Sequence, residues 1–218
     1  MAILGISGSP KVGGNTDRMV KAVLEKSGKE FEFINLSTLR FDPCRGCCHL
    51  CAVTNMCGRK DDLHPYLKKV LEAEALILGT PFQLGMPTGF MFNFLTRLEC
   101  FNHAETVFAD KPGLLITVGC KPDEIQAEDG IPRFEKMVDH GDLIRSIGHI
   151  YFNSQSPPCL SCGAGSYCRK GGLWVYILGK DEKKLEDFEF TPDKFHQWED
   201  CPQIVEEVNR YSLMLGDL

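Results

Sequence analysis

Short apolar runs alternate along this chain with longer segments whose apolar residues recur at helical spacing. The short runs predict five buried strands, over Ala2–Ser7, Phe31–Leu36, Ala75–Leu78, Gly113–Val118 and His149–Phe152. The longer segments predict helices over Asn15–Lys26, from Asp61 to Leu71, and over Thr88–Phe101, Phe134–Ile147 and Cys201–Leu215. Asp61 and Asp62 suit the start of the second helix, because acidic side chains are stabilised at the positive end of a helix dipole.

Strands that alternate with helices predict a parallel sheet covered on both faces. Five such strands fit the doubly wound order of a flavodoxin-like α/β fold, in which ligands bind beyond the carboxyl ends of the strands. The loops Gly8–Asn15, Thr80–Pro87 and Gly119–Pro122 follow strands one, three and four, so we expect them to converge there. Residues 156–199 do not fit the repeat. We interpret them as an insertion before the last helix of a single domain spanning residues 1–218, with a candidate strand at Leu173–Leu178.

Composition narrows the class of protein. Hydrophobic residues make up 43% of the 218 residues and charged residues 25%, which is ordinary for a chain with a real core. The net charge of -6 offers no basic surplus for nucleic acid. No apolar run approaches the roughly 18 residues of a membrane span, and the amino terminus lacks the basic region of a signal peptide. We therefore expect a cytoplasmic protein with neither nucleic acid nor membrane as a partner.

A loop rich in glycine and hydroxyl groups joins the first strand to the first helix, with the sequence Ser-Gly-Ser-Pro-Lys-Val-Gly-Gly-Asn-Thr over residues 7–16. Glycines let a backbone approach an anion, and the following helix adds partial positive charge. The loop is neither G-x-G-x-x-G nor a nucleotide P-loop. The pattern predicts a phosphate site, the alternative being a plain strand-to-helix turn with an Asn cap.

This loop resembles the phosphate loop of the NADPH-dependent FMN reductase and iron-sulfur flavoprotein family. The resemblance continues through Pro43 to Asp62, Thr80–Phe82 and Thr88–Arg97, and it implies FMN as cofactor and a homodimer or homotetramer. Phe82 and Gln83 stand where the family has a branched residue and a tyrosine, and Cys120 replaces a glycine, so the ring contacts differ. The candidate cofactor-binding residues are Ser7, Ser9, Pro10, Lys11, Gly14, Asn15, Thr16, Thr80, Pro81, Phe82, Gln83, Leu84, Gly85, Gly119 and Cys120.

Eight of the eleven cysteines fall into two tight groups, which points to metal or redox chemistry in a cytosolic protein. The first group contains Cys44, Cys47, Cys48, Cys51 and Cys57. Four thiolates in one short loop can hold a [4Fe-4S] cluster, with either Cys47 or Cys48 spare. Structural zinc and free redox-active thiols remain alternatives.

The second group, Cys159, Cys162 and Cys168, lies in the insertion. Its three thiolates suit a second cluster, which we favour, or a zinc ion, with a fourth ligand from Cys120, Cys201 or the spare cysteine of the first group. A loop of free thiols is the third alternative. A segment this rich in proline and glycine has few apolar residues before Leu173, so we expect metal to order it.

The pattern as a whole predicts an FMN-dependent oxidoreductase of the iron-sulfur flavoprotein type. It would relay electrons between flavin and [4Fe-4S] cluster, with a redox partner protein or NAD(P)H as its counterpart and no catalytic acid or base of its own. One alternative is an NAD(P)H-dependent FMN reductase of quinone, azo or nitro compounds with structural or zinc-binding cysteines. The other is a redox or metal sensor that is not an enzyme.

Overall fold

The computed structural model describes residues 2–103, 110–120, 125–140, 143–154, 159, 162–189 and 196–218, with only the backbone of 125–127 and 140. Five parallel strands form the sheet in the order β2-β1-β3-β5-β6. They are β1 (Ile3–Ser7), β2 (Phe31–Asn35), β3 (Leu76–Gln83), β5 (Pro112–Gly119) and β6 (Arg145–Asn153). A sixth strand, β4 (Met86–Pro87), pairs antiparallel with the end of β3. The parallel order confirms the predicted flavodoxin-like α/β fold.

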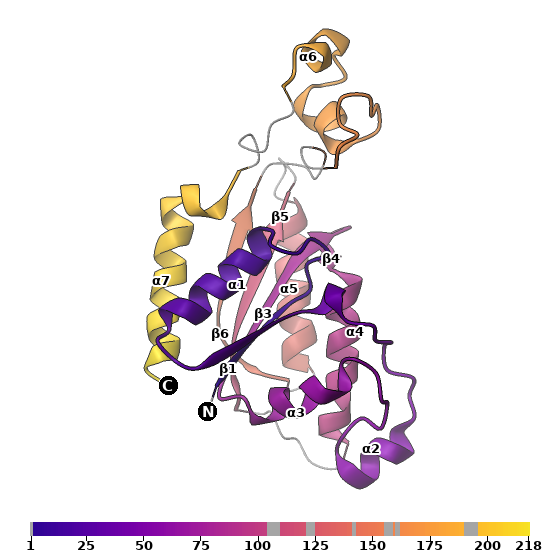
Figure 1. Cartoon of the computed structure of the whole chain (residues 1–218), viewed down its shortest axis with the longest axis vertical. Coiled ribbons are helices and arrows are strands. Elements are labelled where there is room, and N and C mark those ends of the chain that lie inside the picture. Colours follow the sequence, from indigo (N-terminus) through magenta and orange to yellow (C-terminus); the bar gives the residue numbers. More distant parts are fainter. Residues whose placement is uncertain are drawn as a thin grey trace.

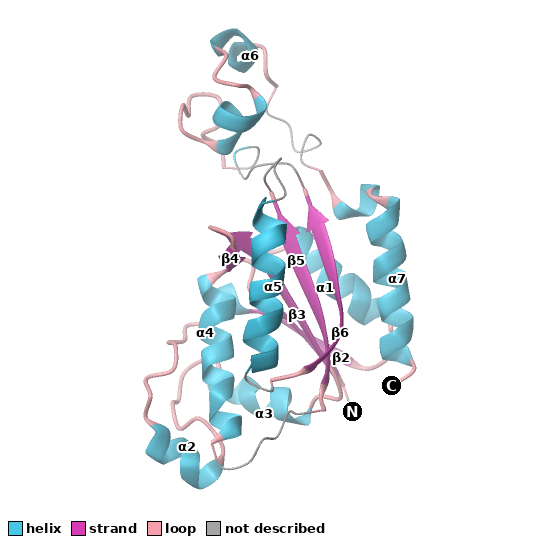
Figure 2. Ribbon diagram, turned by 180° about the vertical axis from the view of Figure 1, so that it is seen from behind, coloured by secondary structure: helices cyan, strands magenta, loops and turns pink. Residues whose placement is uncertain are grey.

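Helices cover both faces of this sheet, as Figures 1 and 2 show from opposite sides. On one face lie α1 (Asn15–Lys26) and α7 (Pro202–Gly216). On the other lie α3 (His64–Glu72), α4 (Gly89–Leu98) and α5 (Ile125–His140). The described residues also contain short helical segments: α2 (Cys48–Thr54), α6 (Glu182–Glu186), and 3-10 turns at Leu36–Thr38, Glu99–Asn102 and Trp198–Asp200.

Alternation along each strand divides the interior into two cores. In β1, Ile3 packs with the residues of α1 and α7, whereas Leu4 packs with those of α3 and α4. In β3, Ile77 and Leu78 divide between the two cores in the same way. Since successive strand residues point to opposite faces, the near-continuous apolar runs of the sequence are what a sheet buried on both faces requires.

Three predicted elements need correction. β3 does not end at Gly79-Thr80-Pro81, because Phe82 and Gln83 continue it by pairing with β4. The predicted helix Phe134–Ile147 is displaced: α5 ends at His140, and Arg145–Ile147 belong to β6, where they extend its pairing with β5. The candidate strand Leu173–Leu178 is instead a helical turn of π type over Leu173–Ile177. Its apolar residues face a small core rather than alternating between two sides.

Among the helices of the described residues, none combines the length and apolar character that a membrane crossing requires.

Candidate flavin and cysteine sites

A buried carboxylate organises the loop that follows β1. The carboxylate of Asp17, 1% exposed, accepts hydrogen bonds from the Ser7 hydroxyl (2.5 Å), the Gly13 amide (2.8 Å) and the Asn35 side-chain amide (2.9 and 3.0 Å). The Ser7 oxygen in turn accepts from the backbone N–H of Ser9. Ser7 therefore shapes the predicted phosphate loop from beneath, with its hydroxyl proton committed to Asp17.

Asn15 is also committed to protein partners. Its side chain donates to the carbonyl of His196 (3.1 Å) and accepts from Arg18 (2.6 Å) and from the backbone N–H of Trp198 (3.4 Å). Arg18 strengthens the same junction through an ion pair of 2.7 Å with Glu199. These bonds hold the segment before α7 against the start of α1. The sequence does not indicate them, since His196 lies 181 residues from Asn15 along the chain.

In this loop, the groups available to bind an anion are mainly backbone amides. The N-cap of α1 is Gly14, which has no side chain to occupy the amides of the first turn. The first helical amides lack partners within their own helix, so they form a ready anion site. Ser9 accepts from the Lys11 amide (3.2 Å) and donates to the Lys11 carbonyl (2.9 Å), which fixes the curve of the loop above them. Thr16 is buried at the same helix start.

The loop after β1 is in direct contact with the segment after β3, as predicted. The Thr88 hydroxyl, which also caps α4, donates to the carbonyl of Gly8 over 2.7 Å. The hydroxyl of Thr80 accepts from the Thr88 amide over 3.1 Å. Gly8 must be glycine here, because a Cβ atom would lie 2.8 Å from the Cβ of Met91 and 2.9 Å from the Thr88 hydroxyl. The start of α4 is thus locked to the predicted phosphate loop.

The predicted ring-binding segment is a two-residue hairpin between β3 and β4. Leu84 (φ 54°) and Gly85 (φ 72°) both have positive φ, as the mirror-image turns of tight hairpins require. Leu84 is 97% exposed at the tip. The ring of Phe82 instead turns inward, against Gly130 of α5 and 6.2 Å from the ring of Tyr151. Phe82 therefore supports the hairpin from behind, which leaves Pro81, Gln83 and Leu84 nearer to solvent.

At the end of β5, Gly119 and Cys120 reach the same edge of the sheet. The carbonyl of Gly119 accepts from the amide (2.9 Å) and hydroxyl (3.1 Å) of Ser154, which closes β5 against the end of β6. Cys120 is half-buried next to it. The rest of the predicted loop, residues 121 and 122, lies outside the described residues.

The first cysteine group forms a pocket at the other end of α4. All five predicted cysteines line it, together with Cys100, His103 and three arginines, Arg45, Arg59 and Arg97. The amide of Cys44 donates to Thr96 of α4 (3.2 Å), and the Asn55 side chain donates to the carbonyl of Phe101 (2.8 Å). These two bonds attach the cysteine loop to α4 and the turn after it.

Arg97 lies behind these cysteines with a side chain that is 0% exposed. It donates to the carboxylate of Asp61 (2.6 and 3.3 Å) and to the carbonyl of Asp42 (3.0 Å). Although burial alone raises the pKa of Asp61, the hydrogen bond and charge of Arg97 hold that pKa below its ordinary value. Burial acts to lower the pKa of Arg97, but Asp61 and the neighbouring Cys57 act in the opposite direction and have the larger combined effect. The pKa of Arg97 is therefore raised, and the guanidinium keeps its charge.

This donor set fits an anionic iron-sulfur cluster. The Nε atoms of Arg59 and Arg97 are buried and have no hydrogen-bond partner in the described part of the chain, although both side chains line the cysteine pocket. Buried N–H groups are rarely left unpaired, and N–H groups directed at sulfur are a means of adjusting cluster potential. Within the described residues, no three His, Cys, Asp or Glu side chains are already spaced as a metal site, so ligation requires the thiols to turn inward.

The thiols of Cys51 and Cys100 hold their protons when no metal is bound. Burial and then the neighbouring Cys57 raise the pKa of Cys51, and burial raises the pKa of Cys100 to about 12. Metal binding by Cys51 must therefore displace its proton. Sequence reasoning left Cys100 out of the group. The signal for it was its position three residues after Arg97, which places both near one face of the predicted helix.

The helix α4 connects the two candidate sites, and Figure 1 shows it running from the β4 hairpin towards α2. Thr88 contacts the phosphate loop at its start, and Thr96 contacts Cys44 near its end. Thr88 and Thr96 are eight residues apart, which corresponds to about 12 Å at about 1.5 Å per residue. A rigid helix thus sets the spacing between the phosphate loop and the cysteine pocket.

The second cysteine group belongs to a small lobe with its own core. Leu173, Trp174, Leu178 and Leu185 form that core, and Cys159 packs against it. Cys162 and Cys168 accept hydrogen bonds from the backbone N–H groups of Ala164 (3.4 Å) and Gly171 (3.2 Å). The predicted lack of apolar residues therefore applies only to the part of the lobe before Leu173. The charged run after residue 180 is α6, exposed except for Leu185.

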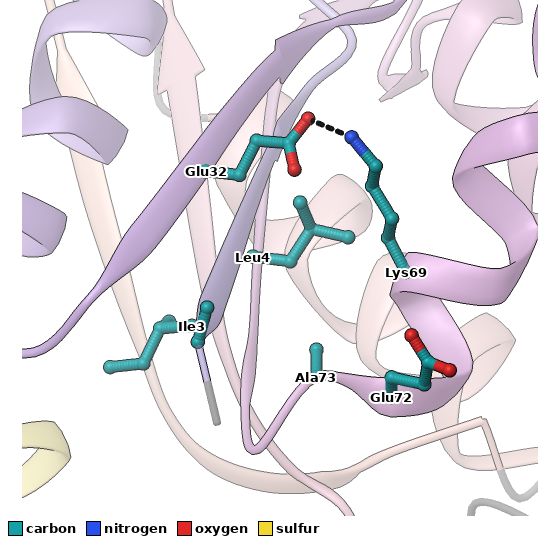
Figure 3. A pocket seen from close by; sticks show the side chains of 7 residues that line it. Ile3, Leu4, Glu32, Lys69, Glu72 and Ala73 are labelled. Atoms are coloured by element: carbon teal, nitrogen blue, oxygen red, sulfur yellow. Dashed lines mark hydrogen bonds and ion pairs between the residues drawn. The ribbon is translucent and has the colours of Figure 1, made fainter.

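A roomier pocket lies at the opposite, amino-terminal edge of the sheet (Figure 3). Ile3, Leu4 and Ala73 form its floor, and a Glu32–Lys69 ion pair of 2.6 Å crosses it. It contains none of the predicted site residues. In open α/β sheets ligands bind at the carboxyl ends of strands, so we do not assign the flavin to it.

Parallel strands in this order, with a donor-rich loop after β1, define a flavodoxin-like protein. Solved structures agree in fold: an oxidoreductase from Corynebacterium diphtheriae (TM-score 0.55, 11% identity, covering 100% of this chain and 96% of that one) and a flavodoxin from the domain Archaea (0.50, 12%, 100% and 97%). A family model, NADPH-dependent FMN reductase, matches residues 1–128, more than half of the chain. The chain therefore belongs to that family of FMN-dependent oxidoreductases.

Curated relatives carry the name iron-sulfur flavoprotein. One from Methanocaldococcus jannaschii is 41% identical over 88 residues, covering 39% of this chain and 45% of the relative. One from Archaeoglobus fulgidus is 32% identical over 131 residues, covering 57% and 59%. One from Methanosarcina thermophila is 27% identical over 122 residues, covering 55% and 63%. The aligned part of the chain thus spans about half the length of the curated relatives it matches.

Proposed function

We propose that this protein is an FMN-dependent oxidoreductase that holds a [4Fe-4S] cluster in its first cysteine group and passes electrons between flavin and cluster. The observation that carries the proposal is the pocket in which six cysteines meet Arg59 and Arg97, whose Nε atoms are buried without a hydrogen-bond partner among the described residues. Family membership and the names of the relatives support FMN and an iron-sulfur centre. When bound, the two groups supply two-electron and one-electron redox chemistry.

The residues of this chain bind and orient the two redox groups and exclude water from them. We assign the FMN phosphate to the loop Ser7–Thr16, where backbone amides at the start of α1 meet the anion and Asp17 holds the loop in shape. The other predicted cofactor contacts lie along the carboxyl edge of the sheet, in the β3–β4 hairpin and at Gly119 and Cys120. At the cysteine pocket, Arg59 and Arg97 offset the negative charge of the thiolates.

Four of the five cysteines in the loop are assigned as ligands: Cys44, Cys47, Cys51 and Cys57. Cys51 and Cys57 are buried and Cys47 is half-buried, whereas Cys44 and Cys48 are exposed, Cys48 at the first position of α2. Of the four neighbouring thiols that raise the pKa of Cys51, Cys57 has the largest effect and Cys48 the smallest. Cys48 is therefore the spare residue of the group, and Cys100 is a buried neighbour rather than a ligand.

The test is chemical analysis of protein purified without oxygen. We expect FMN together with about four iron and four sulfide per chain, and flavin and cluster absorption in one visible spectrum. Cys47→Ser should lose the iron and Cys48→Ser should keep it, since the two variants differ only in which neighbouring thiol is removed. FMN without iron in the native protein would favour the alternative, an NAD(P)H-dependent FMN reductase with free thiols. A chain that retains neither FMN nor iron would favour a sensor.

The remaining features of the proposal rest on the family resemblance and on cysteine chemistry. We propose a single flavodoxin-like domain with residues 156–199 inserted, assembled as a homodimer or homotetramer. Reduced thiols in both groups fit the cytoplasm. NAD(P)H or a redox partner protein is the proposed electron counterpart.

A further inference from the structure

We propose that Cys159, Cys162 and Cys168 bind a single tetrahedral zinc ion, which stabilises the fold of the small lobe within residues 159–189. This site is separate from the flavin and from the first cysteine group, and it does not depend on the proposed function. Its basis is the backbone around the sulfurs: two of them already meet at one glycine, and because no three such side chains of the described residues are yet spaced as a metal site, zinc binding requires the third thiol to join them.

The first observation is a close approach of two sulfurs to one glycine. A Cβ atom at Gly171 would lie 2.7 Å from the Sγ atom of Cys159 and 3.3 Å from that of Cys168. The sulfurs of two cysteines far apart in the lobe are therefore gathered at one point against bare backbone. Any side chain at position 171 would occupy the space in which a shared ion would bind them.

The second observation is that backbone amides are directed at the sulfurs. The amide of Ala164 donates to Cys162 (3.4 Å), and the amide of Gly171 donates to Cys168 (3.2 Å). Gly163, which follows Cys162, has φ 77°, so the chain can turn back over the sulfur as other residues do only at a cost. Such N–H groups offset thiolate charge. Lys170 adds positive charge two residues after Cys168, whereas the charge of Arg169 is paired with that of Glu182 (2.8 Å).

The third observation is that the lobe is too small to hold one shape on its apolar core alone. That core has four buried residues, and Cys159 packs on its edge. Chains below about 40 residues usually need a disulfide, metal or partner to fold. Bound metal would join the turn containing Cys162 and Cys168 to the core through Cys159, and its binding energy would become folding energy.

Zinc fits this lobe better than the second cluster that the sequence suggested. Residues 159–189 contain three cysteines, and a [4Fe-4S] cluster takes four thiolates. Zinc accepts three thiolates and completes its tetrahedron with water, a carboxylate or an imidazole. Binding releases the thiol protons to solvent while three Zn–S bonds form, so neither oxidant nor reductant is needed.

The experiment is metal analysis of the full chain, grown with zinc and iron and purified without oxygen. We expect about one zinc per native chain and none in the variant Cys159→Ser, Cys162→Ser, Cys168→Ser. A control with Ser166→Ala and Tyr167→Phe on the same turn should keep its zinc. FMN and iron are measured in the same samples and should be equal in all three proteins, so a failure of the flavin or cluster assignments appears separately.

A second variant tests the arrangement without removing a thiol. Gly171→Ala keeps all three cysteines, but its methyl group occupies the point where two sulfurs meet. We expect it to release zinc to a competing chelator at a concentration at least about tenfold lower than the native chain does. Equal retention would overturn the role given to Gly171. Zinc that persists in the triple-serine variant, a native chain without zinc, or a variant that loses about four iron instead would each overturn the zinc site.

Discussion

Arg97 and Asp61 form a salt bridge behind the cysteine pocket, with a distance of 2.6 Å between Nη1 and Oδ2. The bridge ties the end of α4 to the segment that precedes α3, and Arg97 adds a hydrogen bond to the carbonyl of Asp42 at the start of the cysteine loop. One fully buried side chain thus connects three segments that surround the cysteines. The remaining Nε–H group has no hydrogen-bond partner among the residues that the structure describes.

Replacing Arg97 by methionine should destabilise the fold strongly. The change keeps much of the side-chain volume but leaves the Asp61 carboxylate without its main partner, and breaking a buried ion pair costs about 3–5 kcal/mol. Because Asp61 is 14% exposed, we expect the lower end, about 3 kcal/mol, measured by urea unfolding of the metal-free chain.

Arg45→Met is the matched control. Arg45 also pairs with a carboxylate, that of Asp42 at 3.0 Å, but its side chain is 68% exposed. Exposed pairs contribute at most about 1 kcal/mol, so this variant should unfold near the native midpoint. Equal effects of the two substitutions would show that Arg97 does not act as a buried ionic connection.

Gly8→Ala should separate the phosphate loop from α4. The new methyl group would meet the Cβ atom of Met91 and the Thr88 hydroxyl at less than van der Waals distance. Overpacking of this kind costs about 1–3 kcal/mol in stability, and the loop that must move is the one assigned to the FMN phosphate. We expect FMN to bind about tenfold more weakly, measured by titration of the apoprotein.

The control for this substitution is Gly89→Ala, one residue after Thr88. A Cβ atom there meets nothing within 4 Å, and alanine suits a helix. FMN affinity should not change, and stability should rise by less than about 1 kcal/mol. Unchanged affinity in Gly8→Ala as well would place the flavin away from this loop.

The sequence was sufficient for the centre of the sheet because β1, β3 and β5 are buried on both faces and contain continuous apolar runs. It was insufficient where distant pairing decides the outcome. Gly79, Thr80 and Pro81 are turn-forming residues, yet β3 continues through them because they pair with β5, and pairing with β4 then extends the strand to Gln83. The run Leu173–Leu178 is equally apolar as strand or helix, and periodicity alone does not separate the two.

The candidate sites, too, could be predicted from the sequence only in part. The donors of the phosphate loop are adjacent in sequence, so the loop could be found, but the roles of Ser7 and Asn15 depend on Asp17 and on the carbonyl of His196. Cys100 joins the first cysteine group only through the path of α4 and the turn that follows it. No local pattern indicates the contact of Asn15 with His196, since it follows from tertiary packing.

His149 should make stability depend on pH. Its ring lies between the Thr117 hydroxyl (2.8 Å) and Glu135 (3.0 Å). Burial lowers the pKa of His149 below 6.5, although Glu135 acts in the opposite direction. The unfolded chain then binds a proton at a higher pH than the folded chain does. His149 therefore contributes stability above about pH 6.5, and this is lost as the pH falls towards the folded pKa.

The measurement is the urea midpoint between pH 7.5 and about 5.5, for the native chain and for His149→Gln. The native chain should lose stability by up to about 1.4 kcal/mol per pH unit more than the variant, because glutamine does not titrate. Parallel profiles for the two proteins would mean that His149 does not titrate differently in the folded and unfolded states.

We expect Leu84 to lower the stability of the fold and to strengthen FMN binding. It adopts φ 54° at the hairpin tip, where its side chain is 97% exposed, and a left-handed conformation costs a residue other than glycine about 1 kcal/mol or more. Asparagine tolerates that conformation, and Asn-Gly is the preferred pair for such a turn. Leu84→Asn should therefore raise the unfolding free energy by about 1 kcal/mol.

If the side chain of Leu84 covers the isoalloxazine ring as the hairpin assignment implies, FMN should also bind to Leu84→Asn about fivefold more weakly, equivalent to about 1 kcal/mol of lost apolar burial. Leu213→Asn, on an exposed position of α7, removes the same apolar surface away from the carboxyl edge of the sheet and should leave FMN affinity unchanged. A more stable Leu84→Asn protein with native FMN affinity would separate the two effects, and it would remove the hairpin tip from the flavin site.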